Sequence, residues 1–179
     1  MDLSFPIDGD DLLAPISNSV SSPTKKKDAG SKGVQKIEQL LKGLEIEYRR
    51  EFTFKKCKDV RCLPFDFMII VNGMVSVIEY DGKQHFEVVS RFHGSNSEQA
   101  NLKLIKQKKH DIIKNKYTHD SNISLLRISY QEDEIIEKII FDFIARLKSS
   151  RVPTRVDLFS NVALYNNPYG QSETACVVM

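Results

Sequence analysis

Two acidic side chains stand close together in the stretch IEYDGKQHF, residues 78–86. Its β-branched and aromatic residues predict a strand, and side chains on a strand alternate between faces, so Glu79 and Asp81 should point the same way. Asp66, in LPFDF, belongs to the preceding predicted strand, and a hairpin between the two strands could bring its carboxylate to the same edge. We therefore predict that three acids converge there.

Clustered carboxylates of this kind predict a divalent-cation site, with Asp66, Glu79 and Asp81 as the metal ligands. Like charges a few ångströms apart raise one another's pKa and destabilise a fold, and a cation between them removes that conflict. Carboxylate oxygens suit Mg²⁺ or Mn²⁺, which keep several waters and commonly meet a substrate phosphate. The chemistry that follows is phosphodiester hydrolysis, because such a metal activates water and offsets charge in the transition state.

The elements that must position these acids form a pattern typical of an α/β fold. Asn72-Gly73 is a strong hairpin signal between two of the strands. The predicted elements are a helix from residue 31, strands at 45–54, 63–71 and 74–81, a helix over 97–117, a strand at 122–130 and a closing helix up to 148. We expect a mixed central β-sheet flanked by helices, in the order α-β-β-β-α-β-α.

The domain predicted for residues 31–148 is flanked by two polar segments. Residues 1–30 mix Ser, Pro, Gly and Lys without apolar periodicity, which predicts a flexible N-terminal arm. Residues 149–179 return to Ser, Pro, Asn and Gly, and we expect a C-terminal tail with a short ordered piece around RVDLFSNVALY.

Composition favours a single globular domain, since 41% of the 179 residues are hydrophobic and 28% are charged. No apolar run approaches a membrane span and no secretory signal precedes the domain, so we expect an intracellular protein. Cys57, Cys62 and Cys176 cannot all pair and lack partners at zinc-site spacing, which indicates free thiols. The final CVVM fits a prenylation pattern at Cys176, but no basic run adjoins it and we do not expect that modification.

The net charge is only +2, so any surface for nucleic acid must be local. Lysines crowd the predicted helix over 97–117, among them Lys103, Lys106, Lys109 and Lys114. Charge runs are usually solvated faces. Beside a phosphodiester site, we expect these lysines to contact nucleic acid.

Four segments together, PFDF, IEYDGKQHF, HDIIKNKY and LLRISY, resemble the PD-(D/E)XK nuclease superfamily. Within it, the chain is similar to the branch of very-short-patch repair endonucleases and their homing-endonuclease-associated relatives. The resemblance covers about residues 31–130. It implies a restriction-endonuclease-like fold and a Mg²⁺-dependent endonuclease that acts on DNA, with Asp66 and Glu79 as metal ligands.

The family pattern places a lysine two residues after Glu79, where this chain has Asp81. The branch shares that departure, which implies that Asp81 extends the metal site and that the positive or proton-transferring role moves to Lys83, Gln84 or His85. We favour His85 as the general acid/base, because its ordinary pKa lies near working pH. Lys83 would stabilise phosphate charge.

Two further elements bear on the resemblance. Asp111 and Lys114 match an Asp-x-x-Lys element, one helical turn apart, which could brace the site, touch the nucleic-acid backbone or form a simple salt bridge. Related first helices often begin Gly-Glu-x-x-Ile with the Glu aimed at the metal, whereas this chain has Gly33 followed by Val34. Glu38, one turn later, is the candidate substitute.

Two other functions stay open. The missing acid motivates the first, a nuclease-like fold without catalysis that binds nucleic acid or protein. The second is an endonuclease that cleaves RNA, since the same site could cut either polymer. A double-strand cut usually calls for two such sites, so a homodimer is compatible with the prediction.

Overall fold

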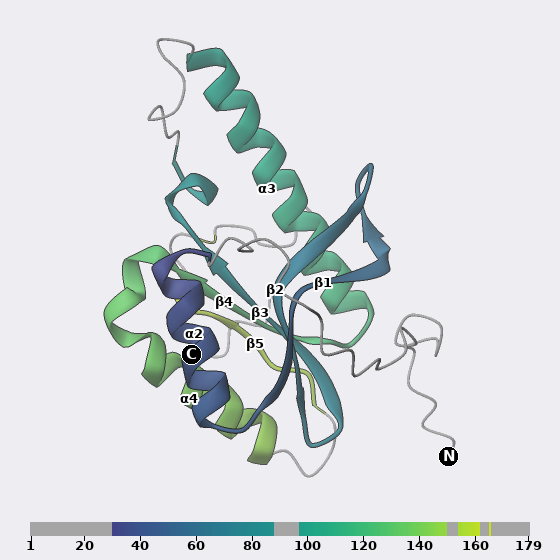
Figure 1. Ribbon diagram of the computed structural model, residues 1–179. Helices are drawn as coiled ribbons and strands as arrows, with labels where there is room; N and C mark the ends of the chain where they lie inside the picture. Colours follow the sequence, from purple (N-terminus) through teal and green to yellow (C-terminus); the bar gives the residue numbers. More distant parts are fainter. Residues whose placement is uncertain (1–29, 88–96, 150–153, 162–164, 166–179) are drawn as a thin grey trace, which may run out of the picture.

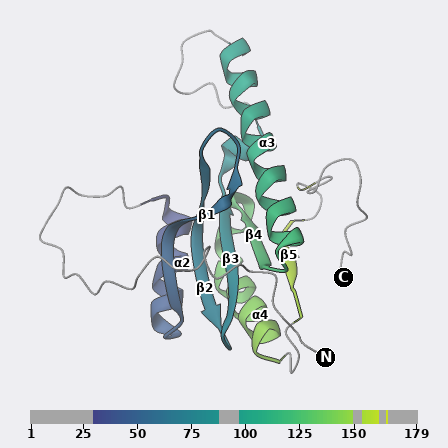
Figure 2. The same cartoon turned by 90° about the vertical axis from the view of Figure 1, so that its right-hand side faces the viewer.

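The computed structural model describes residues 30–87, 97–149, 154–161 and 165, which form one mixed sheet with helices on both faces (Figures 1 and 2). The α/β class predicted from the sequence is confirmed. The helices are α2 (Lys32–Gly43), α3 (Ser97–Asp120) and α4 (Ile136–Ser149), with short 3₁₀ turns η1 (Lys83–His85) and η2 (Tyr130–Ile135). The strands are β1 (Glu47–Lys58), β2 (Cys62–Val71), β3 (Met74–Asp81), β4 (Ser124–Ser129) and β5 (Asp157–Phe159).

The sheet has the order β1-β2-β3-β4-β5. The first three strands are antiparallel neighbours, and Asn72 and Gly73 both take positive φ in the turn between β2 and β3, as a tight hairpin requires. The β4 strand returns parallel to β3 after α3, and β5 returns parallel to β4 after α4. Crossovers through helices are the usual way to join parallel strands.

Each face of the sheet has its own core. On one face, α2 and α4 bury residues such as Ile37 and Phe143 against Phe67 and Ile78. On the other face, the second half of α3 covers a smaller cluster that includes Phe54. Figure 2 shows the sheet between these two layers. Side chains that alternate along β3 therefore alternate between the α2/α4 layer and the α3 layer.

The first half of α3 projects beyond the sheet (Figure 1). Leu102 and Ile105, two apolar residues of this half, are 60% and 63% exposed. Ile113, further along, packs on the α3 core. None of the described helices, the 24-residue α3 included, combines the length and apolar character needed to cross a membrane.

The sheet continues beyond the predicted boundary at residue 148, because β5 pairs with β4 through Leu158 and its neighbours. Cys57 and Cys62 are free thiols, as predicted. Residues 1–29 of the arm predicted over 1–30 lie outside the described residues, as do Cys176 and most of the C-terminal tail.

Gly33 fixes how closely the start of α2 approaches β3. A Cβ at this position would lie 2.2 Å from the Tyr80 ring, which real contacts essentially never show. The ring cannot move away freely, because the Tyr80 hydroxyl donates a hydrogen bond to Asp133 at 2.5 Å. Gly43, at the other end of the same helix, has nothing within 4 Å of an added Cβ.

We predict that Gly33→Ala lowers the free energy of unfolding by about 1–3 kcal/mol, because the added methyl overpacks against Tyr80. Gly43→Ala is the matched control and should be neutral or stabilising by up to about 1 kcal/mol, since alanine favours helix. Urea denaturation of both variants measures the difference. Equal stability of the two variants would contradict the close approach of α2 to β3.

Candidate functional site

Asp66 and Glu79 lie at the point where the β2–β3 ladder ends. The last pair of that ladder on this side joins Phe67 to Ile78, so Asp66 and Glu79 are the next residues outward on the two strands. Asp66 Oδ2 accepts a hydrogen bond from the Tyr80 backbone N–H at 2.7 Å. The carboxylate thereby replaces a backbone acceptor and stays beside β3.

Lys114, from α3, completes this first group of charges. Its Nζ lies 2.7 Å from Glu79 Oε1, and both side chains are buried. The same ammonium lies 5.2 Å from the centre of the Phe65 ring. The structure therefore places Lys114 inside the protein against a carboxylate, and not on the exposed lysine surface of α3. We refer to Asp66, Glu79 and Lys114 as the carboxylate pair with its lysine.

Burial dominates the electrostatics of this group. Burial raises the pKa of Glu79, the Lys114 charge lowers it, and the negative charge of Asp66 raises it. The net pKa of Glu79 is about 7. Burial also raises the pKa of Asp66, opposed by the hydrogen bond from Tyr80. Burial alone would lower the pKa of Lys114, but the Glu79 charge and hydrogen bond raise it overall. Glu79 is therefore only partly ionised at neutral pH, and burial opposes ionisation of Asp66 as well.

Arg127, on β4, organises a second group of charges around Asp81. Its Nε and Nη2 donate to Asp81 Oδ2 and Oδ1 at 2.7 and 2.5 Å, and both side chains are fully buried. Nη2 also donates to Asp111 Oδ1 at 2.9 Å, and Nη1 donates to Asn115 Oδ1 at 2.8 Å. This fork-to-carboxylate geometry is among the strongest charge-assisted arrangements in proteins.

His85 lies between the two acids of this second group. Its Nδ1 is 3.1 Å from Asp81 Oδ1 and 3.0 Å from Asp111 Oδ2. Burial lowers the pKa of His85, but the hydrogen bond to Asp111 and the Asp81 charge raise it overall. Burial opposes ionisation of Asp111, yet the Arg127 charge holds its pKa well below the usual range. Asp111 is therefore a permanent acceptor that orients the imidazole.

Asp81, His85 and Asp111 also offer ligand atoms that all lie within 4.8 Å of one another, close enough to hold a metal ion. Both carboxylates of this set already bind Arg127, whose positive charge opposes a second cation. By contrast, Asp66 Oδ1 and Glu79 Oε2 accept no hydrogen bond from any described residue. Both sets therefore offer carboxylate oxygens of the kind that a hard dication binds, and each has a cation beside it.

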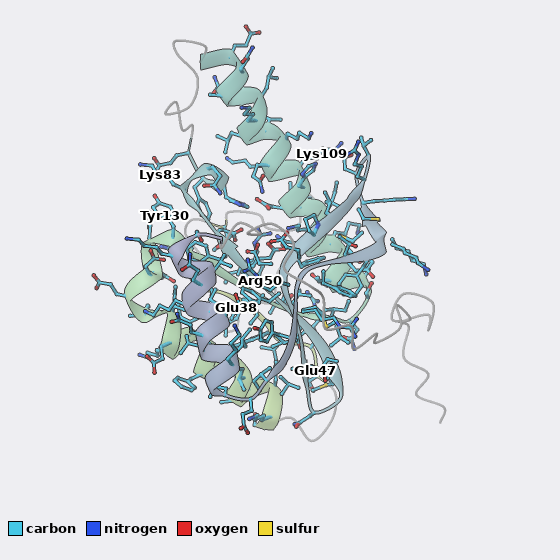
Figure 3. All side chains as sticks on the ribbon, in the orientation of Figure 1. Glu38, Glu47, Arg50, Lys83, Lys109 and Tyr130 are labelled. Carbon is cyan, nitrogen blue, oxygen red and sulfur yellow. The ribbon has the colours of Figure 1, made fainter. Side chains whose placement is uncertain are left out.

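Lys83 and Gln84 lie outside both groups. The β3 strand ends at Asp81, Gly82 starts the η1 turn, and Lys83 and Gln84 are exposed. Lys83 forms an ion pair with exposed Glu87 at 3.2 Å. Figure 3 shows Lys83 and Lys109 on different sides of α3.

The predicted nucleic-acid residues of α3 divide into two sets. Lys103, Lys106 and Lys109 are exposed, whereas Asp111 and Lys114 belong to the buried charge groups described above. Lys109 Nζ lies 2.6 Å from Asp59, in the turn between β1 and β2.

Glu38 does not replace the acid that is missing at Val34. Its carboxylate accepts a hydrogen bond from the Tyr48 hydroxyl at 2.9 Å and pairs with Arg50 at 3.2 Å and with Lys42 at 3.0 Å (Figure 3). Val34 is buried in the core beneath α2 and α4. Within the described residues, α2 thus supplies no carboxylate to either charge group.

Several residues of the second group were not predicted as site residues, among them Gln107, whose Nε2 lies 3.1 Å from His85 Nδ1. Arg127 carried a signal, because an arginine in the apolar strand NISLLRISY must find a buried counter-charge. Asn115 resembled any polar helix residue. Tyr165 donates its hydroxyl to Asp81 Oδ2 at 2.7 Å, and nothing in its polar surroundings in the sequence indicated this contact.

A scan against protein-family models found no match, and searches of curated proteins and of solved structures found none either. The resemblance to the nuclease superfamily therefore stays a prediction.

We predict that Arg127→Met lowers the free energy of unfolding by about 3–5 kcal/mol, because it leaves Asp81 buried without a counter-charge. Arg127→Lys keeps the charge but loses the two-point contact, so its loss should be smaller. Arg146→Met removes an exposed pair with Asp142 on α4 and is the control, with an expected change below about 1 kcal/mol. Urea denaturation would contradict the assignment if Arg127→Met and Arg146→Met lost the same stability.

Proposed function

We propose that this protein is an intracellular endonuclease that uses Mg²⁺ or Mn²⁺ to hydrolyse phosphodiester bonds in DNA. The observation that carries the proposal is the carboxylate pair with its lysine. Asp66 and Glu79 approach from adjacent strands, each has one oxygen engaged by the protein, and each keeps its second oxygen for a ligand. Two carboxylates that retain open oxygens suit a Mg²⁺ ion that also binds a phosphate.

The charge balance of the site supports a dication. Four carboxylates, those of the pair together with Asp81 and Asp111, face the permanent cations Lys114 and Arg127. Two negative charges stay uncompensated when His85 is neutral. A divalent ion at the pair would offset them and lower the raised pKa values of both carboxyls.

The two charge groups divide the chemistry between them. Asp66 and Glu79 would hold the ion, which when bound lowers the pKa of an attacking water and offsets charge on the phosphate. Lys114 holds Glu79 in place through its 2.7 Å contact. His85, oriented by Asp111, is the general acid/base that accepts or returns a proton.

Asp81 has a different role in this proposal from the ligand role that the sequence suggested. Both of its oxygens are bound by Arg127, and one of them also contacts His85. Asp81 therefore positions His85 and Arg127 instead of completing the metal shell. Binding of the ion by Asp81, His85 and Asp111 is the competing arrangement, and metal titration separates the two.

We predict that Asp66→Asn and Glu79→Gln each lower metal-dependent cleavage of DNA by at least about 100-fold, since either change removes a charged ligand. Nicking of supercoiled plasmid with Mg²⁺, Mn²⁺ or chelator measures this, alongside single-stranded DNA and RNA. Glu38→Gln is the control, because Glu38 is an ion-paired acid away from the site. Unchanged cleavage by the first two variants would disprove the assignment. DNA binding by the unaltered protein without cleavage would favour a binding module.

We predict that Mn²⁺ binds with release of protons and that its affinity rises as the pH increases through about 7, because Glu79 must ionise first. Calorimetric titration in buffers of different ionisation enthalpy measures both effects. Asp66→Asn should weaken binding by more than about tenfold, whereas His85→Gln should leave it nearly unchanged. The opposite order of effects would place the ion in the second group.

A further inference from the structure

The tip of the β1–β2 hairpin, residues 55–62, is a second basic surface that the sequence did not single out. Four of its side chains are exposed cations and one is an acid; the cations are Lys55, Lys56, Lys58 and Arg61. Lys58 pairs with Cys62, so a three-residue loop closes the hairpin. At the centre of this loop, Val60 is 91% exposed, which no packing in the described fold explains.

The acid of the hairpin tip is neutralised by α3. Asp59 lies 2.6 Å from Lys109 Nζ and 3.3 Å from His110 Nε2. The Lys109 charge and hydrogen bond hold the pKa of Asp59 below its usual value. These contacts attach the tip to the side of the helix, so that hairpin and helix present one surface.

The exposed lysines of α3 extend that surface. Lys103, Lys106 and His110 recur at i, i+3 and i+7, which places them along one side of the helix, the side that contacts the hairpin. The hairpin tip and the first half of α3 project from the same end of the sheet in both views (Figures 1 and 2). The combined surface is strongly basic although the whole chain carries a net charge of only +2.

The hairpin tip is connected directly to the candidate site. The β2 strand starts at Cys62 and reaches Asp66 four residues later, which corresponds to about 13 Å along an extended strand. A polymer held at the tip would therefore pass within reach of the carboxylate pair. This relation favours a long phosphate-bearing partner over a small anion.

We infer that the hairpin tip enters the major groove of duplex DNA as a two-stranded ribbon, held against α3 by Asp59. The major groove admits a ribbon of this kind. Lys58 precedes the loop and Arg61 ends it, on either side of Val60, and both would contact phosphates. Val60 would make apolar contact with base edges such as the thymine methyl. The inference rests on the proposed function for its choice of polymer, and it identifies duplex DNA as the substrate form.

Binding is tested with the full chain in chelator, where cleavage does not intervene, using fluorescence anisotropy on a labelled duplex and the matching single strand. The double variant Lys58→Ala with Arg61→Ala should bind the duplex about tenfold more weakly, and the slope of log affinity against log salt should fall by about 2. The same double variant should lose less affinity for the single strand than for the duplex. Val60→Ser should weaken duplex binding without changing the salt slope.

The control is a second pair of exposed lysines, Lys138→Ala with Lys148→Ala, on α4 at the far face of the sheet. This pair should leave duplex affinity close to that of the unaltered protein. If both double variants have the same affinity and slope, or if the unaltered chain binds no duplex at low salt, the inference is wrong. Binding of an acidic protein by the tip would then be the remaining explanation for its charge.

Asp59→Ala tests the attachment to α3. Removal of a negative charge would strengthen DNA binding if charge alone mattered, whereas we expect weaker duplex binding because the tip loses its contact with Lys109. Tighter duplex binding by this variant would contradict the proposal that the hairpin tip acts together with α3 as one attached surface. All of these readouts are independent of catalysis, so a failed cleavage assay would count against the proposed function and leave the binding result to stand by itself.

Discussion

The two-point ion pair between Arg127 and Asp81 is the interaction on which the arrangement of the site depends. A buried guanidinium is costly unless each donor is satisfied, and here the donors reach Asp81 on β3 and both Asp111 and Asn115 on α3. The face of the same group lies 5.8 Å from the centre of the Tyr165 ring. Satisfying Arg127 therefore requires α3 and a residue of the C-terminal tail to meet at the end of β3.

The position of α3 then determines what the carboxylate pair encounters. Asp111 and Lys114 are one helical turn apart, and Glu79 and Asp81 are two residues apart on β3, so one docking event forms both contacts. The two charge groups differ in how completely their acids are neutralised. The arginine neutralises its acids strongly, whereas the lysine faces two carboxyls whose pKa values burial raises. This difference is what favours a cation at the carboxylate pair in the function proposed above.

Sequence periodicity predicted the sheet because alternation and helical spacing are local, and the Asn72-Gly73 turn set the register that brings Asp66 beside Glu79. Other features depend on tertiary contacts. The sequence marked Lys114 through its spacing from Asp111, but its buried partner Glu79 became evident only once the helix was docked on β3. Asp81 resembled a metal ligand because its counter-charge comes from a strand more than 40 residues later. The exposure of the first half of α3 reflects the limited length of the sheet beneath it, which helical periodicity does not encode.

The central claim is that a hard dication binds between Asp66 and Glu79. The most direct measurement is anomalous diffraction from crystals soaked in Mn²⁺. The account predicts one strong anomalous peak at coordination distance, about 2.0–2.2 Å, from an oxygen of each of these two carboxylates. A peak surrounded instead by Asp81, His85 and Asp111, or no peak in fully soaked crystals, would contradict it.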